Sequence, residues 1–377
     1  MAGDSSLPLM RTVVVSDLHL GSRSEGDVLR RRVARDALLE RVDGADRLVL
    51  LGDAIELRQC PARDAMAVAQ PVLEELGAAL GKGGEVVLVP GNHDHALVAP
   101  WLERRGAHVE PPPLGLEEHP GTTASAATEA IAQWMAPATL TVAYPGIWLR
   151  DDVYATHGHY LDRHTTVPTF ERLGAGIMGR LVGSVPETGA RPEDYEAALA
   201  PLYAWMHAMA ERSGGGRRRP PSAASAEAWR VLGGDGHRPL RGRLLAGILP
   251  LGISGINRLG LGPVRADFSA EELRRAGVFA MAEAASRLGV EARHVLYGHT
   301  HRAGPFANDD SLEWSLHDGG RLTNTGCWVY EPVFLQRGRS SPYWPGCVVE
   351  LRASGPPILS RLLTEVDPDA LKAPARA

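Results

Sequence analysis

Short runs of aliphatic and β-branched residues recur along the chain, and each run ends in polar residues. Five such runs are found at residues 11–19, 47–53, 85–94, 153–159 and 294–301. Runs of this length and composition are typical of buried strands. Helical periodicity at residues 27–42 and 62–80 separates the first three runs. The N-terminal part therefore predicts a β-α-β-α-β arrangement with parallel strands, and hence an α/β fold.

The polar residues that follow these runs are expected to lie close together, because ligands bind beyond the carboxyl ends of the strands in such sheets. They are Asp17, His19, Asp53, Asn92, His157, His299 and His301. Mixed carboxylate, amide and imidazole ligands suit divalent ions such as Mn²⁺, Fe²⁺ or Zn²⁺. Seven ligands are too many for one ion, so we expect two divalent metal ions that share the carboxylate of Asp53.

Composition and charge disfavour several other classes of protein. The chain has 377 residues, 44% of them hydrophobic, and can bury a core large enough for one big domain or two ordinary ones. Its formal net charge of -5 disfavours nucleic acid as a partner, because such partners need a basic surface. An odd count of 3 cysteines and an N-terminus without a signal-peptide pattern predict a cytoplasmic protein without a disulfide framework.

Five motifs in a fixed order carry a resemblance to a known family. They are DLH (17–19), GD (52–53), GNHD (91–94), HGH (157–159) and GHTH (298–301). In this order they resemble the motifs of the calcineurin-like metallophosphoesterases, over about residues 11–160 and 290–352. The resemblance implies a four-layer α/β/β/α sandwich in which two metal ions and a bridging hydroxide hydrolyse phosphate esters or anhydrides.

The same resemblance distributes the ligands between the two ions. One ion would take Asp17, His19, Asp53 and His301, and the other would take Asp53, Asn92, His157 and His299. No other cofactor is implied. Each histidine alone could be an ordinary structural residue, and an aspartate could cap a helix, but neither explanation accounts for the whole ordered set.

His93 lies beside a predicted ligand without being one, and is expected to face the substrate. We predict that it protonates the leaving oxygen or neutralises charge on the phosphoryl group. Asp94 is expected to accept a hydrogen bond from its other ring nitrogen, which would fix the tautomer and favour the imidazolium. His95 and His159 match no ligand position and are expected around the metal ligands or toward solvent.

A long insertion separates the fourth and fifth motifs, since the gap is too long for a loop. Helical patterns occur at residues 167–183, 193–213, 241–260 and 269–289, the last with a capping box from Ser269 to Glu272. The predicted domains are a catalytic domain of residues 11–160 and 290–365, a large helical cap of residues 161–289, and a tail of residues 366–377. Gly174, Gly176 and Gly179 have the spacing of a dinucleotide site, but no strand precedes them, so we interpret them as small residues for helix packing.

The substrate is expected to be a phosphorylated small molecule or a lipid-linked phosphate. Glu56 in GDAIE (52–56) resembles the UDP-2,3-diacylglucosamine pyrophosphohydrolase branch of the family, whereas HGHYLD (157–162) and the length of the insertion depart from it. Residues 244–257 are apolar but too short to span a bilayer. They either pack as ordinary core or hold the cap at the inner membrane face.

Two other classes of function stay open. A non-enzymatic protein-binding scaffold on the same fold is expected to lose metal ligands, and a nuclease of the same superfamily is expected to add basic and aromatic surface. Two local predictions complete the sequence analysis: a hairpin at Pro145 and Gly146 within residues 139–149, and a late strand at residues 347–352. The oligomeric state is left open.

Overall fold

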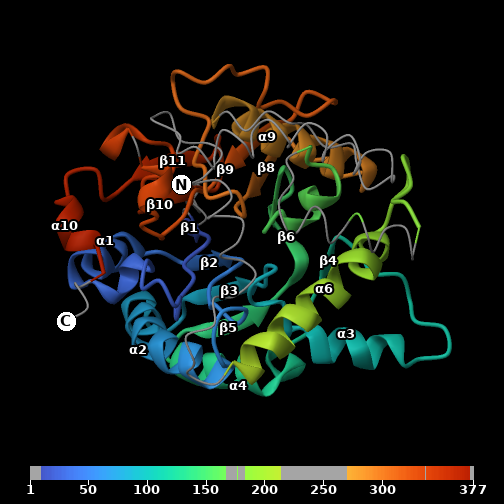
Figure 1. Ribbon diagram of the computed structural model, residues 1–377, viewed down its shortest axis with the longest axis horizontal. Coiled ribbons are helices and arrows are strands. Elements are labelled where there is room, and N and C mark those ends of the chain that lie inside the picture. Colours follow the sequence, from blue (N-terminus) through green and yellow to red (C-terminus); the bar gives the residue numbers. More distant parts are fainter. Residues whose placement is uncertain (1–9, 167–175, 177–182, 214–269, 336, 374–377) are drawn as a thin grey trace, which may run out of the picture.

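Two β-sheets packed face to face form the centre of the protein. The computed structural model describes residues 10–166, 176, 183–213, 270–335 and 337–373 (Figure 1). The six-stranded sheet has the order β11-β10-β1-β2-β3-β5, with β1 (Thr12–Val15), β2 (Arg47–Leu51), β3 (Glu85–Val89), β5 (Thr139–Val142), β10 (Cys347–Leu351) and β11 (Ile358–Arg361). The five-stranded sheet has the order β4-β6-β7-β8-β9, with β4 (Glu117–Glu118), β6 (Tyr144–Arg150), β7 (Val153–Thr156), β8 (His294–Tyr297) and β9 (Arg321–Asn324).

The directions of the strands determine where the turns that carry the predicted ligands lie. In the first sheet β1, β2, β3 and β5 run parallel, and at one edge β10 pairs antiparallel with β1 and β11 pairs antiparallel with β10. In the second sheet β7, β8 and β9 run parallel, whereas β6 is antiparallel to both β4 and β7. The polar turns after β1, β2 and β3 therefore share one edge of the first sheet, and those after β7 and β8 share one edge of the second.

Alternating side chains divide the core into layers. Val14, Val49 and Val87 point from the first sheet toward Ile147 and Leu296 of the second, and these residues belong to one buried cluster. Neighbours on the same strands point the other way, because successive strand residues face opposite sides of a sheet. The protein is therefore a four-layer α/β/β/α sandwich, as predicted.

Helices cover the outer faces of both sheets. The first sheet packs against α1 (Arg32–Val42), α2 (Ala62–Leu80) and α4 (Ala126–Trp134), and the second against α9 (Ala270–Arg287) (Figure 1). The other helices are α3 (Ala99–Gly106), α6 (Pro192–Arg212) and α10 (Pro368–Leu371). Short 3₁₀ helices are η1 (Val28–Arg30), η2 (His95–Leu97), η3 (Thr122–Ala124), η4 (His159–Arg163), η5 (Pro332–Phe334) and η6 (Gly338–Ser340). Within the described residues, none of the helices has the length and apolarity needed to cross a membrane.

The predicted hairpin at Pro145 and Gly146 is wrong. Strand β5 pairs with β3 in the first sheet, whereas β6 pairs with β7 in the second, so the chain changes sheets at Ala143. Gly146 lies inside β6, where a Cβ atom would come 2.2 Å from the hydroxyl of Tyr154. The lack of a side chain at Gly146 therefore allows β6 to approach β7 closely. The observed hairpin joins β6 to β7.

Part of the predicted insertion is described. Helices α6 and α9 confirm the patterns at 193–213 and 269–289. The helix predicted at 241–260, the apolar residues 244–257, Ser269, Gly174 and Gly179 lie outside the described residues, as does most of 167–183. The division into a catalytic domain and an inserted cap stays a prediction.

Candidate metal centre

The predicted ligands converge where the carboxyl ends of the strands of both sheets meet. Asp53 Oδ2, after β2, lies 3.2 Å from His157 Nε2, after β7. Asp17 Oδ1, after β1, lies 3.3 Å from His301 Nε2, after β8. Asn92, after β3, places its side-chain oxygen 3.1 Å from His157 Nε2. The structure thus brings together side chains from five strands and two sheets.

Backbone strain is concentrated on these residues. Five of the seven predicted ligands have a left-handed backbone, namely Asp17 (φ 54), His19 (φ 45), Asp53 (φ 51), His299 (φ 66) and His301 (φ 59). Among the described non-glycine residues, Glu25 alone shares this conformation. A left-handed backbone is uncommon for such residues and costs roughly 1 to 3 kcal/mol each, and it tends to persist at functional sites. The turns are therefore held in a conformation that orients the ligand side chains at a cost to the stability of the fold.

The first ligand group is Asp17, His19 and His301, whose ligand atoms all lie within 4.8 Å of one another. Asp17 Oδ2 accepts hydrogen bonds from the Ser16 hydroxyl at 2.5 Å and from the His299 backbone N–H at 3.0 Å. Its Oδ1 is buried and accepts no hydrogen bond among the described residues. An ionised oxygen in that state, beside two imidazole nitrogens, is what a cation would satisfy.

The second group is Asp53, His157 and His299, with Asn92 between them. His157 Nδ1 donates to the Leu51 carbonyl at 3.0 Å, which leaves Nε2 unprotonated in the neutral ring and directed at Asp53. His299 Nε2 pairs with Asp162 Oδ1 at 3.0 Å, which leaves Nδ1 facing the Asn92 oxygen at 3.1 Å. Such hydrogen bonds fix the tautomer and ring orientation of metal-binding histidines.

The side-chain oxygen of Asn92 faces only hydrogen-bond acceptors. Exchanging its oxygen and nitrogen would let the amide donate to both rings and accept from Arg58. A cation between Asn92, His157 and His299 would instead keep the oxygen where it is, because an amide oxygen is a metal ligand and an amide nitrogen is not. The donor set therefore fits a divalent ion in this group too.

Asp53 lies between the two groups. Its Oδ2 is 3.2 Å from His157 Nε2 and 3.7 Å from His19 Nε2, and its Oδ1 accepts the His93 backbone N–H at 2.7 Å. Gly52 makes this approach feasible, because a Cβ there would come 2.1 Å from His157 Nδ1 and its φ of +83° suits glycine. The carboxylate is thus placed where a shared ligand has to be.

The pKa shifts of these residues show that the buried carboxylates of the site attract positive charge. Burial alone would lower the pKa of His19 and His157, but the carboxylates beside them raise it, to about 9 for His19 and about 10 for His157. Burial likewise opposes ionisation of Asp53, yet the neighbouring imidazoles of His157 and His93 hold its pKa well below the usual range. Protons thus balance the buried carboxylates, and a divalent ion would displace them.

The predicted contact between Asp94 and the His93 ring is wrong, and Glu56 takes that place. Asp94 accepts backbone N–H groups of Gly91 at 2.6 Å and Ala54 at 2.7 Å, so it joins the turns after β2 and β3. Asp94 immediately precedes η2, and its carboxylate binds these backbone N–H groups instead of the His93 ring. Its pKa is raised to about 6 by burial and by the charge of Asp53.

Glu56 holds two histidines at once. Its Oε2 accepts from His93 Nδ1 at 2.7 Å, from His19 Nδ1 at 3.0 Å and from Gln59 Nε2 at 2.8 Å. Although burial alone would raise its pKa, the neighbouring histidines His93 and His19 hold the pKa of Glu56 well below its usual value, so Glu56 is ionised. Burial also lowers the pKa of His93, against the predicted imidazolium, and the charge of Glu56 does not reverse this. The position of Glu56, three residues after Asp53, was the available sequence signal for its role.

The remaining histidines of the motifs are buried. His95 Nε2 donates to Glu196 Oε2 at 3.0 Å, and His159 lies with its ring 5.6 Å from that of His157. Burial and the neighbouring His157 hold the pKa of His159 well below its usual value, so this ring is neutral. Neither residue faces solvent. Asp162 and Glu196 were not singled out from the sequence, because neither lies within one of the five motifs.

The fold and the site together define a metal-dependent phosphoester hydrolase. Residues 10–195 match the model of the family described as calcineurin-like phosphoesterase, and the chain belongs to this family through that half of its length. His299 and His301 lie beyond the matched residues. No curated protein matches the chain significantly.

Three solved structures are similar over most of the chain but superpose weakly. The cold-active protein tyrosine phosphatase of a psychrophilic Shewanella species is 14% identical, with 93% of this chain and 80% of that chain covered and a TM-score of 0.29. A mutant of a cold-active protein tyrosine phosphatase is 14% identical, with 94% and 79% covered and a TM-score of 0.32. A further structure of such a phosphatase is 13% identical, with 93% and 78% covered and a TM-score of 0.27.

Proposed function

We propose that the protein is a dinuclear metallohydrolase that cleaves a phosphate ester or anhydride in a small phosphorylated molecule. The observation that carries this proposal is the position of Asp53 Oδ2 between two groups of ligands, 3.2 Å from His157 and 3.7 Å from His19. Strained backbone at five of the ligand positions supports it. A protein-binding scaffold would have no use for that strain.

The two proposed ions differ in their ligands. Asp17, His19, Asp53 and His301 would hold one, and Asp53, Asn92, His157 and His299 would hold the other. Bound divalent ions of this kind lower the pKa of a water molecule and neutralise charge on phosphoryl oxygens. The open side of the centre is marked by the more exposed side chains, those of His301 (26%), His93 (14%) and His299 (12%).

His93 is proposed to act on the substrate. Its Nδ1 is held by Glu56, so Nε2 is the ring atom left for a substrate oxygen. Burial lowers the pKa of this ring, and a phosphate anion beside it would make it easier to protonate, because a nearby negative charge raises the pKa of an imidazole. Glu56 then stabilises the imidazolium, and Nε2 donates its proton to the leaving oxygen.

Removal of metal is expected to abolish hydrolysis and to lower thermal stability. Chelator-treated protein should lose activity on p-nitrophenyl phosphate and bis-p-nitrophenyl phosphate, and added Mn²⁺ should restore it, because the buried carboxylates and imidazoles lose their common partner. Elemental analysis should find about two ions per chain. A binding stoichiometry of one would contradict the dinuclear centre. Full metal load without turnover on any phosphate substrate would favour the scaffold.

The class of phosphate bond can be settled by a substrate panel of monoesters, diesters and pyrophosphates. The predicted preference for acyl chains depends on residues 244–257, which lie outside the described residues. An acylated nucleotide-sugar diphosphate compared with the same headgroup without chains tests that preference directly. Equal kcat/KM for the two would contradict the lipid-linked substrate and leave the small-molecule one.

A further inference from the structure

A carboxylate from the predicted insertion is buried against segments that lead from the predicted metal ligands. Glu196, on α6, accepts hydrogen bonds at Oε1 from the hydroxyls of Tyr144 and Tyr160, each at 2.5 Å. Its Oε2 accepts from His95 Nε2 at 3.0 Å. The three donors come from β6, η4 and η2, so the side chain of Glu196 joins α6 to three other segments of the chain.

The protonation states agree with this arrangement. Burial alone would raise the pKa of Glu196, but the hydrogen bonds from His95, Tyr144 and Tyr160 and the charge of His95 lower it. Burial and the charge of Glu196 raise the pKa of both tyrosines well above the usual value. An ionised acceptor therefore meets two protonated tyrosine hydroxyls, and charge-assisted hydrogen bonds of this kind are the strong ones.

Two of the donors are close in sequence to proposed ligands of the second ion. His95 follows Asn92 by three residues and begins η2. Tyr160 follows His157 by three residues and lies in η4, which also carries Asp162. Asp162 Oδ1 in turn holds His299 Nε2 at 3.0 Å. The hydrogen bonds of Glu196 therefore end on the segments that set three ligands.

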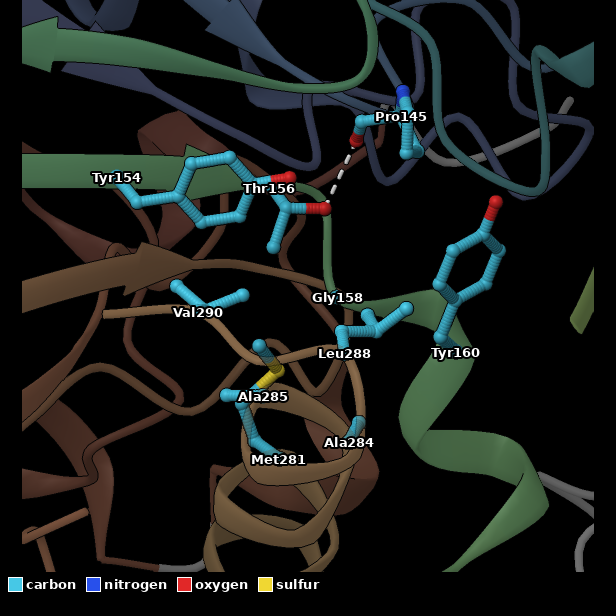
Figure 2. Close-up of a pocket in the computed structure, with 10 residues that line it drawn as sticks. All are labelled: Pro145, Tyr154, Thr156, Gly158, Tyr160, Met281, Ala284, Ala285, Leu288 and Val290. Atoms are coloured by element: carbon cyan, nitrogen blue, oxygen red, sulfur yellow. Dashed lines mark hydrogen bonds between the residues drawn. The ribbon is translucent and has the colours of Figure 1, made fainter. Parts of the chain in front are cut away.

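Tyr160 stacks on a residue of α6 and also lines a small cavity. Its ring stacks on that of Tyr195 from α6, with centroids 4.7 Å apart and planes 14° apart. The ring also lines a small apolar cavity with Met281 and Leu288, and its hydroxyl points away from the α9 residues (Figure 2). The cavity measures about 10 Å³, at the lower limit of the roughly 10 to 15 Å³ that one water molecule needs. It is a packing gap and holds no substrate.

We propose that Glu196 is a positioning residue of the metal centre and that α6 is part of this centre instead of a detachable cap. Through His95 it sets the turn that carries Asn92, and through Tyr160 it sets η4, from which Asp162 orients His299. The second ion would lose affinity without it. The proposal rests on the proposed dinuclear function.

A second glutamate on α6 provides the control for a role of Glu196 that is limited to attaching α6 to the rest of the protein. Glu211 accepts the backbone N–H of Ala62, at the start of α2, at 2.6 Å. It is thus a second α6 carboxylate that binds outside its own helix, but at the first residue of α2 and not on a turn that carries a predicted ligand. If Glu196 only docks α6, Glu196→Ala and Glu211→Ala should shift metal affinity alike.

The test compares Glu196→Ala, Glu196→Gln and Glu211→Ala by bound metal, by the Mn²⁺ concentration for half-maximal activity, and by thermal unfolding. We expect Glu196→Ala to keep about one ion per chain after gel filtration and to need about 10-fold more Mn²⁺, since partners outside the ligand shell change metal affinity by roughly 10- to 100-fold. Glu196→Gln keeps an oxygen for both tyrosines and should recover most of this affinity. Glu211→Ala should retain the wild-type Mn²⁺ requirement.

The outcomes separate the two proposals. A wild-type protein that binds no metal contradicts the dinuclear function itself. A wild type with two ions beside a folded Glu196→Ala variant that also has two ions and an unchanged Mn²⁺ requirement overturns only the role of Glu196. If Glu196→Ala does not fold, Tyr160→Phe decides, because it removes a single hydroxyl and keeps the ring. It should raise the Mn²⁺ requirement a few-fold, and an unchanged requirement in this variant would overturn the proposal.

Discussion

Replacement of Asp53 by asparagine should remove bound metal and activity together. Its Oδ2 lies within reach of both ligand groups, and no other described side chain is so placed between His19 and His157. An amide supplies one neutral oxygen where the carboxylate supplies a charged one, so both ions would lose a ligand and a counter-charge. We expect less than one ion per chain by elemental analysis, and hydrolysis reduced at least about 10³-fold on both p-nitrophenyl esters.

Asp152→Asn is the matched control for this change. Asp152 lies at the turn between β6 and β7 and pairs with Arg150, with 38% of its side chain exposed. Surface pairs of this kind contribute little to stability, so metal content and turnover should equal those of the wild type. An Asp53→Asn variant with both ions and the wild-type rate would show that Asp53 is no shared ligand.

The ligand positions could be predicted because they depend on strand ends. A buried apolar run such as residues 47–51 defines a strand, and the residues two or three places after it must then lie at the carboxyl edge of the sheet. Asp17, Asp53 and Asn92 were found in this way. The parallel order of β1, β2 and β3 brings them together without any need to know the conformation of the turns.

The partners of these residues could not be predicted, because they depend on how the turns fold. Asp94 and Glu56 are both carboxylates near His93, and the sequence favoured the adjacent one. The turn after β3 carries Asp94 under the backbone of Ala54, whereas Glu56 reaches His93 from the neighbouring turn. The direction of the backbone over three residues decides which carboxylate reaches His93, and hydrophobic periodicity carries no information about that direction.

Contacts between residues that are far apart in the sequence are harder still to predict. Glu196 lies 101 residues from His95, and a glutamate in an amphipathic helix usually points to solvent. Residues 100–138 could not be assigned from the sequence either, and they form α3, the two-residue strand β4 and α4. The elements there are short, and their apolar residues find partners only in the folded protein.

Replacement of His93 by alanine should retain both ions and lose turnover. The ring is proposed to donate a proton to the leaving oxygen, and general acid catalysis contributes typically ~10² to 10⁴-fold. The loss should fall in this range for an alkyl phosphate, whose leaving group needs the proton, and should be much smaller for p-nitrophenyl phosphate, whose leaving group departs unprotonated. His119→Ala is the control, since that ring is 54% exposed and pairs with Glu117.

Two results would change the assignment of His93. Equal losses on alkyl and p-nitrophenyl phosphates would mean that His93 neutralises charge on the phosphoryl group and donates no proton, because only proton donation depends on the leaving group. Loss of metal would place His93 among the ligands, for which the structure offers one arrangement: a ring nitrogen of His93 lies within 4.8 Å of the ligand atoms of His19 and Asp53. Glu56→Gln distinguishes these cases further. A neutral amide stabilises an imidazolium less than a carboxylate does, so this variant should reproduce the leaving-group dependence of His93→Ala if His93 is the acid.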